Sequence, residues 1–170
     1  MRRLALALAP ALVVTALIGA SPAQSATTSK DLTFKTELMS AGTVLETLPG
    51  DITYGWNDLR GPTRWGKQDA TLRFLASVNY VSGTGPFGGP VTITRADGTR
   101  LALSVSGWAT SPSDQAGTAN TTLRGTVTVI GGSGRYAGAT GTGTVTGYRK
   151  AALGSPIQFT FSLTVSTPRR

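Results

Sequence analysis

The sequence predicts an all-β protein built as a single eight-stranded antiparallel barrel. Hydrophobic residues recur at every second position in several segments, helical periodicity is absent, and turn residues rich in Gly separate the segments. About eight strands with no helix to cover a sheet leave a barrel or a sandwich. A closed barrel also removes the strand edges that a Thr-rich chain would otherwise expose.

The amino terminus predicts export. Two arginines precede an apolar run at residues 4–20, which Pro10 interrupts, and small residues follow it. This order is typical of a cleavable signal peptide, and the run is too short for a membrane anchor. We therefore expect a signal peptide over residues 1–26, a β-barrel domain over residues 27–170, and a secreted product.

The strands are predicted from their alternation, taken in chain order. The clearest apolar stripes lie in residues 69–80 and 157–165. In the first of these, the opposite face carries polar side chains, and we expect that face to point outward; the alternative is a polar cavity with an Asp69–Arg73 ion pair. The remaining predicted strands are residues 32–38, 43–48, 91–95, 101–108, 120–130 and 140–149.

One connection has a strong local signal. Asp97-Gly98 lies between the predicted strands 91–95 and 101–108. Because a type I′ turn needs residues that tolerate positive φ, this dipeptide predicts a tight antiparallel hairpin.

The composition excludes several kinds of site. The chain of 170 residues has no Cys and no His, so disulfides, Cys or His zinc sites and Ser-His-Asp triads are excluded. We expect no metal and no cofactor. The formal net charge of +8 is compatible with nonspecific attraction to an anionic cell envelope. Its basic residues are scattered, so no specific nucleic-acid site is expected.

A glycine-rich segment resembles a known turn. Residues 131–141 read Gly-Gly-Ser-Gly-Arg-Tyr-Ala-Gly-Ala-Thr-Gly, which resembles the glycine turn of the allene oxide cyclase and dirigent barrels, a calycin-type superfamily with exported bacterial members. The resemblance implies an eight-stranded barrel whose apolar lumen holds one small ligand. It also implies that Tyr136 plugs a barrel end. No catalytic residue is carried over, because only the turn matches.

Residues 50–69 form the most unusual segment, which we predict to be a long loop at the barrel mouth. Two of the three tryptophans lie in it, and an indole ring supplies apolar contact area while charged groups orient a ligand. The alternative is that the two indoles only cap the barrel end. The predicted ligand site comprises Tyr54, Trp56, Arg60, Arg64, Trp65, Asp69 and Tyr136.

The leading functional hypothesis is noncatalytic binding of a small hydrophobic or aromatic molecule, since no side chain titrates near neutrality without special perturbation. The second hypothesis is a cofactor-free cyclase or isomerase, or a dirigent-type stereocontrol protein, acting in the lumen. The third is a structural or carbohydrate-binding envelope protein that uses Trp56 and Trp65. An open apolar lumen would favour the first two hypotheses, and a filled lumen would favour the third.

We predict that the exported protein begins between Gln24 and Thr27, because the small-residue stretch there follows the apolar run. Amino-terminal sequencing and intact mass of secreted material measure this directly. Mature protein that retains Met1 would contradict the prediction.

Overall fold

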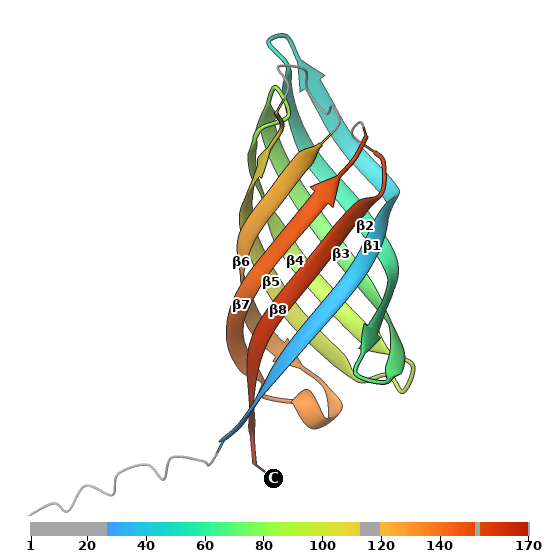
Figure 1. Cartoon of the computed structure of the whole chain (residues 1–170), viewed down its shortest axis with the longest axis vertical. Coiled ribbons are helices and arrows are strands. Elements are labelled where there is room, and N and C mark those ends of the chain that lie inside the picture. The colour runs from blue at the N-terminus through green and yellow to red at the C-terminus, as the bar shows by residue number, and fades with distance from the viewer. Residues whose placement is uncertain (1–26, 113–119, 152–153, 170) are drawn as a thin grey trace, which may run out of the picture.

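The computed structural model describes residues 27–112, 120–151 and 154–169, and the predicted signal peptide at residues 1–26 lies outside them. Eight antiparallel strands close into one barrel in chain order (Figure 1). The prediction of an all-β, eight-stranded barrel is therefore confirmed. The strands are β1 (Thr27–Leu48), β2 (Ile52–Trp65), β3 (Gln68–Val81), β4 (Gly85–Arg95), β5 (Arg100–Thr110), β6 (Thr121–Gly132), β7 (Thr140–Arg149) and β8 (Ile157–Pro168), with a 3₁₀ turn η1 (Gly134–Tyr136) between β6 and β7.

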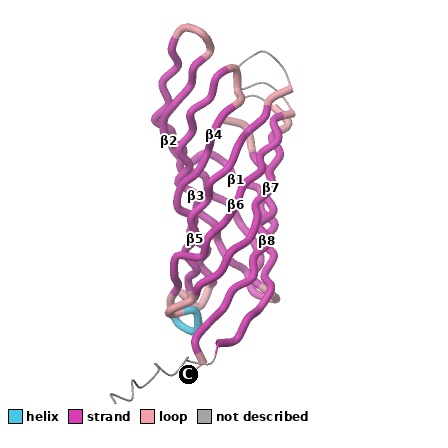
Figure 2. Tube along the Cα trace, turned by 90° about the vertical axis from the view of Figure 1, so that its left-hand side faces the viewer, coloured by secondary structure: helices cyan, strands magenta, loops and turns pink. Residues whose placement is uncertain are grey.

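The barrel closes where the first strand meets the last. β1 pairs with β8 from Thr27 opposite Pro168 to Leu38 opposite Ile157. We call the end that holds the β2–β3, β4–β5 and β6–β7 connections the lower end, and the opposite end the upper end. The lower end also holds η1, as Figures 1 and 2 show. Closure gives every strand two hydrogen-bonded neighbours and fixes one face of each strand inside.

The predicted apolar stripes form the core. In β8, the side chains from Ile157 to Val165 at alternate positions are buried. In β3, Ala70, Leu72, Phe74, Ala76 and Tyr80 are also buried. The opposite face of β3 points outward, as predicted, and Asp69, Thr71 and Arg73 are exposed. Alternation in the sequence therefore assigned inside and outside correctly for these two strands.

The prediction of a long loop over residues 50–69 is wrong, because most of it is strand β2. This strand pairs with β1 on one side and with β3 along its whole length on the other. Its inward face carries Thr53, Asn57, Leu59, Thr63 and Trp65. Three of these five residues are polar, so the strand lacks the apolar alternation by which the other strands were found.

Gly61 in β2 is required by sterics, and together with Pro62 it makes the strand look like a turn in the sequence. A Cβ built on Gly61 would lie 2.0 Å from the carbonyl oxygen of Glu37 in β1. Because no side chain fits there, glycine permits the close approach of the two strands. Gly61-Pro62 reads as a turn signal in the sequence, whereas in the barrel it is part of a continuous strand.

The predicted strands 32–38 and 43–48 are two parts of β1. The pairing register of β1 with β2 shifts between Ser40 and Gly42. Such a bulge bends a strand without ending it. The predicted count of eight strands is therefore correct, although two predicted strands merge and the predicted loop supplies a strand.

The hairpin at Asp97-Gly98 is confirmed, but its turn type differs from the prediction. Gly98 has a φ of +80°, whereas Asp97 does not have a positive φ. The Gly98 amide donates to the Arg95 carbonyl at 3.0 Å, and the Arg95 amide donates to the Thr99 carbonyl at 2.9 Å. The connection is a longer loop in which a turn with ordinary φ values is followed by a left-handed glycine, instead of a two-residue type I′ turn.

We predict that Gly98→Val lowers the free energy of unfolding by on the order of 1 kcal/mol or more, since a β-branched residue is strained at positive φ. An added Cβ would meet no atom within 4 Å, so the loss would come from backbone strain and not from a clash. Gly98→Asn should lose less, because Asn tolerates the left-handed region. Chemical unfolding of both variants measures the difference, and a Val variant as stable as the wild type would contradict the prediction.

Candidate functional site

Aromatic rings close the lower end of the barrel. Trp65 is 3% exposed and meets the buried Phe34 edge-on, with 5.6 Å between ring centroids. Tyr136, on η1, lies 4.7 Å from the Trp65 ring. The guanidinium of Arg95 lies 5.5 Å from the Trp65 ring centroid, and that of Arg135 lies 5.3 Å from the Tyr136 ring centroid. The rings attract one another, and Trp65 and Tyr136 each also attract the cation over the ring face, so packing closes this end.

The upper half of the lumen contains a small cavity of about 20 Å³, enough for roughly one water molecule. Rings make up much of its wall: Phe74 lies 6.4 Å from Phe87 and 5.9 Å from Phe159, centroid to centroid. The lumen is thus largely filled. A filled lumen is the outcome that favours the third hypothesis, a structural or carbohydrate-binding protein. The cavity is lined by Asn57, Leu59, Phe74, Ala76, Val78, Tyr80, Phe87, Leu123, Arg149, Ile157 and Phe159.

Arg149 is the unusual member of this lining. It ends β7 at the upper rim, is 2% exposed, and is the largest fully buried side chain of the described residues. Its Nη2 donates to Thr121 Oγ1 at 3.0 Å, while its Nε has no acceptor. Within residues 27–112, 120–151 and 154–169, no ion pair includes Arg149. Burial lowers the pKa of this guanidinium, which Tyr80 partly offsets. A buried cation without a counter-ion is costly, so this position favours an anion.

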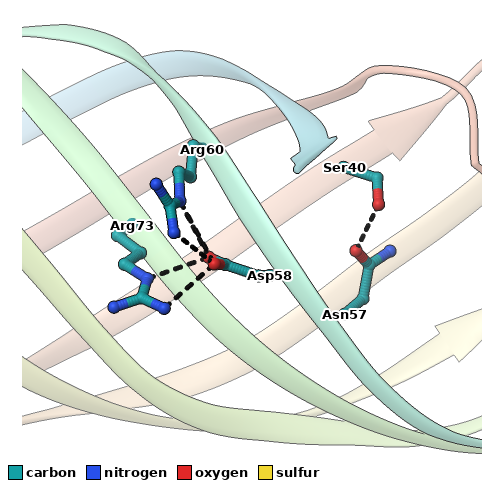
Figure 3. Close-up of polar contacts among 5 residues, drawn as sticks. All are labelled: Ser40, Asn57, Asp58, Arg60 and Arg73. Atoms are coloured by element: carbon teal, nitrogen blue, oxygen red, sulfur yellow. Dashed lines mark hydrogen bonds and ion pairs between the residues drawn. The ribbon is translucent and has the colours of Figure 1, made fainter. Parts of the chain in front are cut away.

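Two polar groups lie with Arg149 in the cavity wall. Burial raises the pKa of Tyr80 to about 12, although the Arg149 charge opposes the shift. Tyr80 is therefore a neutral phenol at physiological pH. Asn57 accepts a hydrogen bond from Ser40 Oγ at its Oδ1, 2.7 Å away (Figure 3). The cavity wall thus offers one cation and neutral polar groups in an apolar surrounding, which is the kind of lining found in small-molecule sites.

The structure separates the seven predicted site residues. Trp65 and Tyr136 lie in contact at the lower end, where both help to close the barrel. Arg64 and Asp69 are exposed near them, with 3.7 Å between Nη1 and Oδ1. Tyr54 lies toward the upper end of β2, and its hydroxyl donates to Glu46. The predicted placement of the six residues other than Tyr136 on one loop is wrong, because the continuous strand β2 spreads them along the barrel.

Trp56 and Arg60 lie on the outer wall. Trp56 is 55% exposed. Arg60 donates to Asp58, with 2.6 Å between Nη2 and Oδ2 (Figure 3). Arg73 also donates to Asp58, at 2.9 Å, so the alternative Asp69–Arg73 pair is not formed. Hydrogen bonds from two guanidinium groups hold the pKa of Asp58 well below its usual range, and the larger effect comes from Arg73 and the smaller from Arg60. This cluster therefore stays ionised and joins β2 to β3 at the surface.

The comparison with solved structures identifies the architecture. The pterocarpan synthase dirigent protein GePTS1 superimposes with a TM-score of 0.57 at 12% sequence identity, covering 89% of this chain and 99% of its own. The fold is that of the dirigent barrel. A second structure, the pterocarpan synthase dirigent protein PsPTS1, gives a TM-score of 0.43 at 13% identity, covering 86% of this chain and 99% of its own. No protein-family model and no curated protein matches the sequence.

Two polar groups in the cavity wall of this dirigent-type barrel, Arg149 and Asn57, are not among the residues predicted from the sequence. Arg149 stands beside Lys150 at the end of a Thr-rich strand, in a chain whose basic residues are scattered. Its position relative to Val145 carries a signal, because residues four apart on a strand share a face and Val145 is buried. The inward direction of Tyr80 was predicted from the apolar stripe of β3. The inward direction of Asn57 does not follow from the sequence, because the prediction of a loop over residues 50–69 gives Asn57 no strand face.

We predict that Tyr80 makes the dirigent-type barrel sensitive to alkaline pH. An unfolded Tyr titrates near pH 10, whereas the folded protein holds this proton until about pH 12. The unfolded chain therefore loses a proton first, and the stability that is fully present below about pH 10 is lost as the pH rises toward 12.

Urea unfolding of the wild type and Tyr80→Phe measures how much stability Tyr80 ionisation removes. Phe lacks the ionisable group and leaves the other titrations in place. Between about pH 9 and 11, the wild type should lose about 1 kcal/mol more than the variant. The same loss in both proteins would contradict the prediction.

Proposed function

We propose that the protein is an exported, noncatalytic binding barrel for a small apolar or aromatic molecule that carries an anionic group. The observation that carries this proposal is the buried Arg149, which has no counter-ion among residues 27–112, 120–151 and 154–169 and lines an apolar, ring-lined cavity. An anionic group of the ligand would pair with the guanidinium, and its apolar body would replace water against the rings.

The ligand needs more room than the present cavity offers. Arg149 starts from the upper rim, and a long Arg side chain can keep its stem on apolar surface while its charged head moves to water. Outward movement of Arg149 would add its own volume to the cavity. The guanidinium would then meet the anionic group of the ligand at the mouth, and the aromatic body would lie deeper.

The second hypothesis, a cofactor-free cyclase, isomerase or dirigent-type stereocontrol protein, uses the same cavity. It is supported by the likeness to a pterocarpan synthase dirigent protein, which at 12% identity is a likeness of fold. In this hypothesis Tyr80 and Arg149 orient a bound substrate, and restriction of its conformation speeds a ring closure. Product formation from a bound probe would separate catalysis from binding.

The third hypothesis, a structural or carbohydrate-binding envelope protein, is supported by the largely filled lumen. Trp56 and Trp108 are both 55% exposed on the outer wall, and exposed indole faces suit the stacking of sugar rings. Tyr54 lies two residues from Trp56 on the same strand. Of the seven predicted site residues, Tyr54 and Trp56 therefore stay candidates for a sugar-binding surface.

The test compares 2-naphthoate, an aromatic carboxylate, with its neutral amide by calorimetry and NMR titration. The wild type should bind the carboxylate more tightly. Arg149→Met keeps an apolar stem and removes the charge, so it should weaken carboxylate binding about tenfold or more and leave amide binding nearly unchanged. Lys150→Met is the matched control at the neighbouring exposed cation, and it should bind both probes as the wild type does.

Two results would contradict the proposal. One is the absence of binding for both probes, which together with sugar binding lost on Trp56→Ala would favour the third hypothesis. The other is an equal loss of carboxylate binding in the Arg149 and Lys150 variants, which would mean that general charge and not the buried guanidinium attracts the probe.

A further inference from the structure

A second site lies at the lower end, outside the lumen. A groove of about 470 Å³ runs between the start of β1, the β2–β3 turn and η1. Its wall includes the cations Lys30, Lys67, Arg95 and Arg135. A neighbouring groove of about 290 Å³ shares Lys30 and Arg135 with it. The two grooves therefore meet at these side chains, and we call them together the lower groove.

The positive charge of the lower groove is compensated in part, because Arg95 lies 3.8 Å from Asp97, between Nη1 and Oδ2. Asp31 is the only carboxylate in its described lining, and it accepts a hydrogen bond from Thr164 at 2.8 Å. In the part of the chain that the structure describes, no ion pair includes Lys30, Lys67 or Arg135. Concave surfaces lined by one sign of charge concentrate the field and attract oppositely charged ligands.

Other surface grooves have fewer cations outside ion pairs. A groove of about 770 Å³ on the outer wall includes Arg60, Arg73 and Arg100, but Asp58 already pairs with the first two. A groove of about 460 Å³ over β7, β8 and β1 is lined by hydroxyl groups and Asp31, with no cation. Among the described residues, the lower groove therefore has three cations outside ion pairs, whereas the outer-wall groove has one, Arg100.

The floor of the lower groove adds unsatisfied donors. Arg95 is 8% exposed and its Nε has no acceptor, and the Nε1 of Trp65 also has none. Both residues line the groove. A buried donor without an acceptor costs free energy, so a ligand oxygen that drew either donor toward it would recover part of that cost.

Hydrogen bonds and ring contacts fix the positions of two of the groove cations, Arg95 and Arg135. Arg135 follows Ser133, whose Oγ accepts from the Arg100 amide at 3.0 Å and whose own amide donates to the Arg100 carbonyl at 2.9 Å. Arg95 and Arg135 lie against the rings of Trp65 and Tyr136. A preformed arrangement loses less entropy when a ligand binds.

We infer that the lower groove binds an anionic polysaccharide through its acidic groups. Two grooves that share cations suit a chain with repeated charges, and Thr28 and Thr167 in the second groove offer hydroxyls to sugar oxygens. Nucleic acid fits less well. Trp65 and Tyr136 are 3% and 5% exposed, so they offer no ring face on which a base could stack.

The experiment titrates three probes at low and moderate salt: a heparin oligosaccharide, oligogalacturonate and single-stranded oligothymidylate. The site variant is Lys30→Gln/Lys67→Gln/Arg135→Gln. The charge-matched control is Lys35→Gln/Arg124→Gln/Lys150→Gln, which removes three exposed cations outside the groove lining. Circular dichroism and thermal unfolding verify that both variants fold.

We expect the wild type to bind an acidic glycan, the site variant to bind it about tenfold more weakly or worse, and the control to lose about twofold at most. The arm that binds shows whether sulfated or carboxylated sugars are preferred. Equal losses in both variants, no glycan binding at low salt, or tighter binding of the oligothymidylate would each overturn the inference. Because Arg149 is intact in both variants, naphthoate binding is expected to persist, and this separates the inference from the proposed function.

Discussion

The pairing of β1 with β8 is the constraint on which the rest of the structure depends. Until the first strand meets the last, each strand has two faces that water can reach, and no position is committed to the interior. Closure along Thr27–Leu38 and Ile157–Pro168 removes the two free edges and creates an inside. Every side chain is then assigned by its place in the alternation, including polar ones that the interior must accommodate.

That assignment buries two arginines, which differ in the groups that compensate their charge. Arg95 at the lower end lies over the Trp65 ring and 3.8 Å from Asp97, so rings and a carboxylate offset the cost of its burial. Arg149 at the upper end is buried more deeply and donates to the hydroxyl of Thr121, and no carboxylate of the described residues pairs with it. The lumen is therefore packed at the lower end, and its buried arginine is compensated. At the upper end the buried arginine keeps a charge that an anion could neutralise, which is the reason for proposing a small-molecule site there.

The outer surface follows from the same alternation. Asp58, Arg60 and Arg73 point outward from β2 and β3 and satisfy one another across the strands. Lys30, Lys67 and Arg135 come from three distant parts of the sequence, and the barrel brings them to one groove without a matching set of carboxylates. Charge scattered along the sequence thus becomes concentrated in space, and a sequence without basic clusters still yields a basic site.

The sequence by itself determined the fold class, the faces of β3 and β8, the hairpin at Gly98 and the place of Tyr136 in a glycine turn. These features depend on local alternation and on φ values that only certain residues adopt. It did not reveal β2, because Thr53, Asn57 and Thr63 face inward and Gly61-Pro62 imitates a turn. Only the tertiary structure decided that Trp56 and Trp65 lie apart, that Arg149 is buried, and which cations share a groove. The physical reason is that burial and proximity across a barrel come from pairing between strands far apart in the chain, which local patterns do not record.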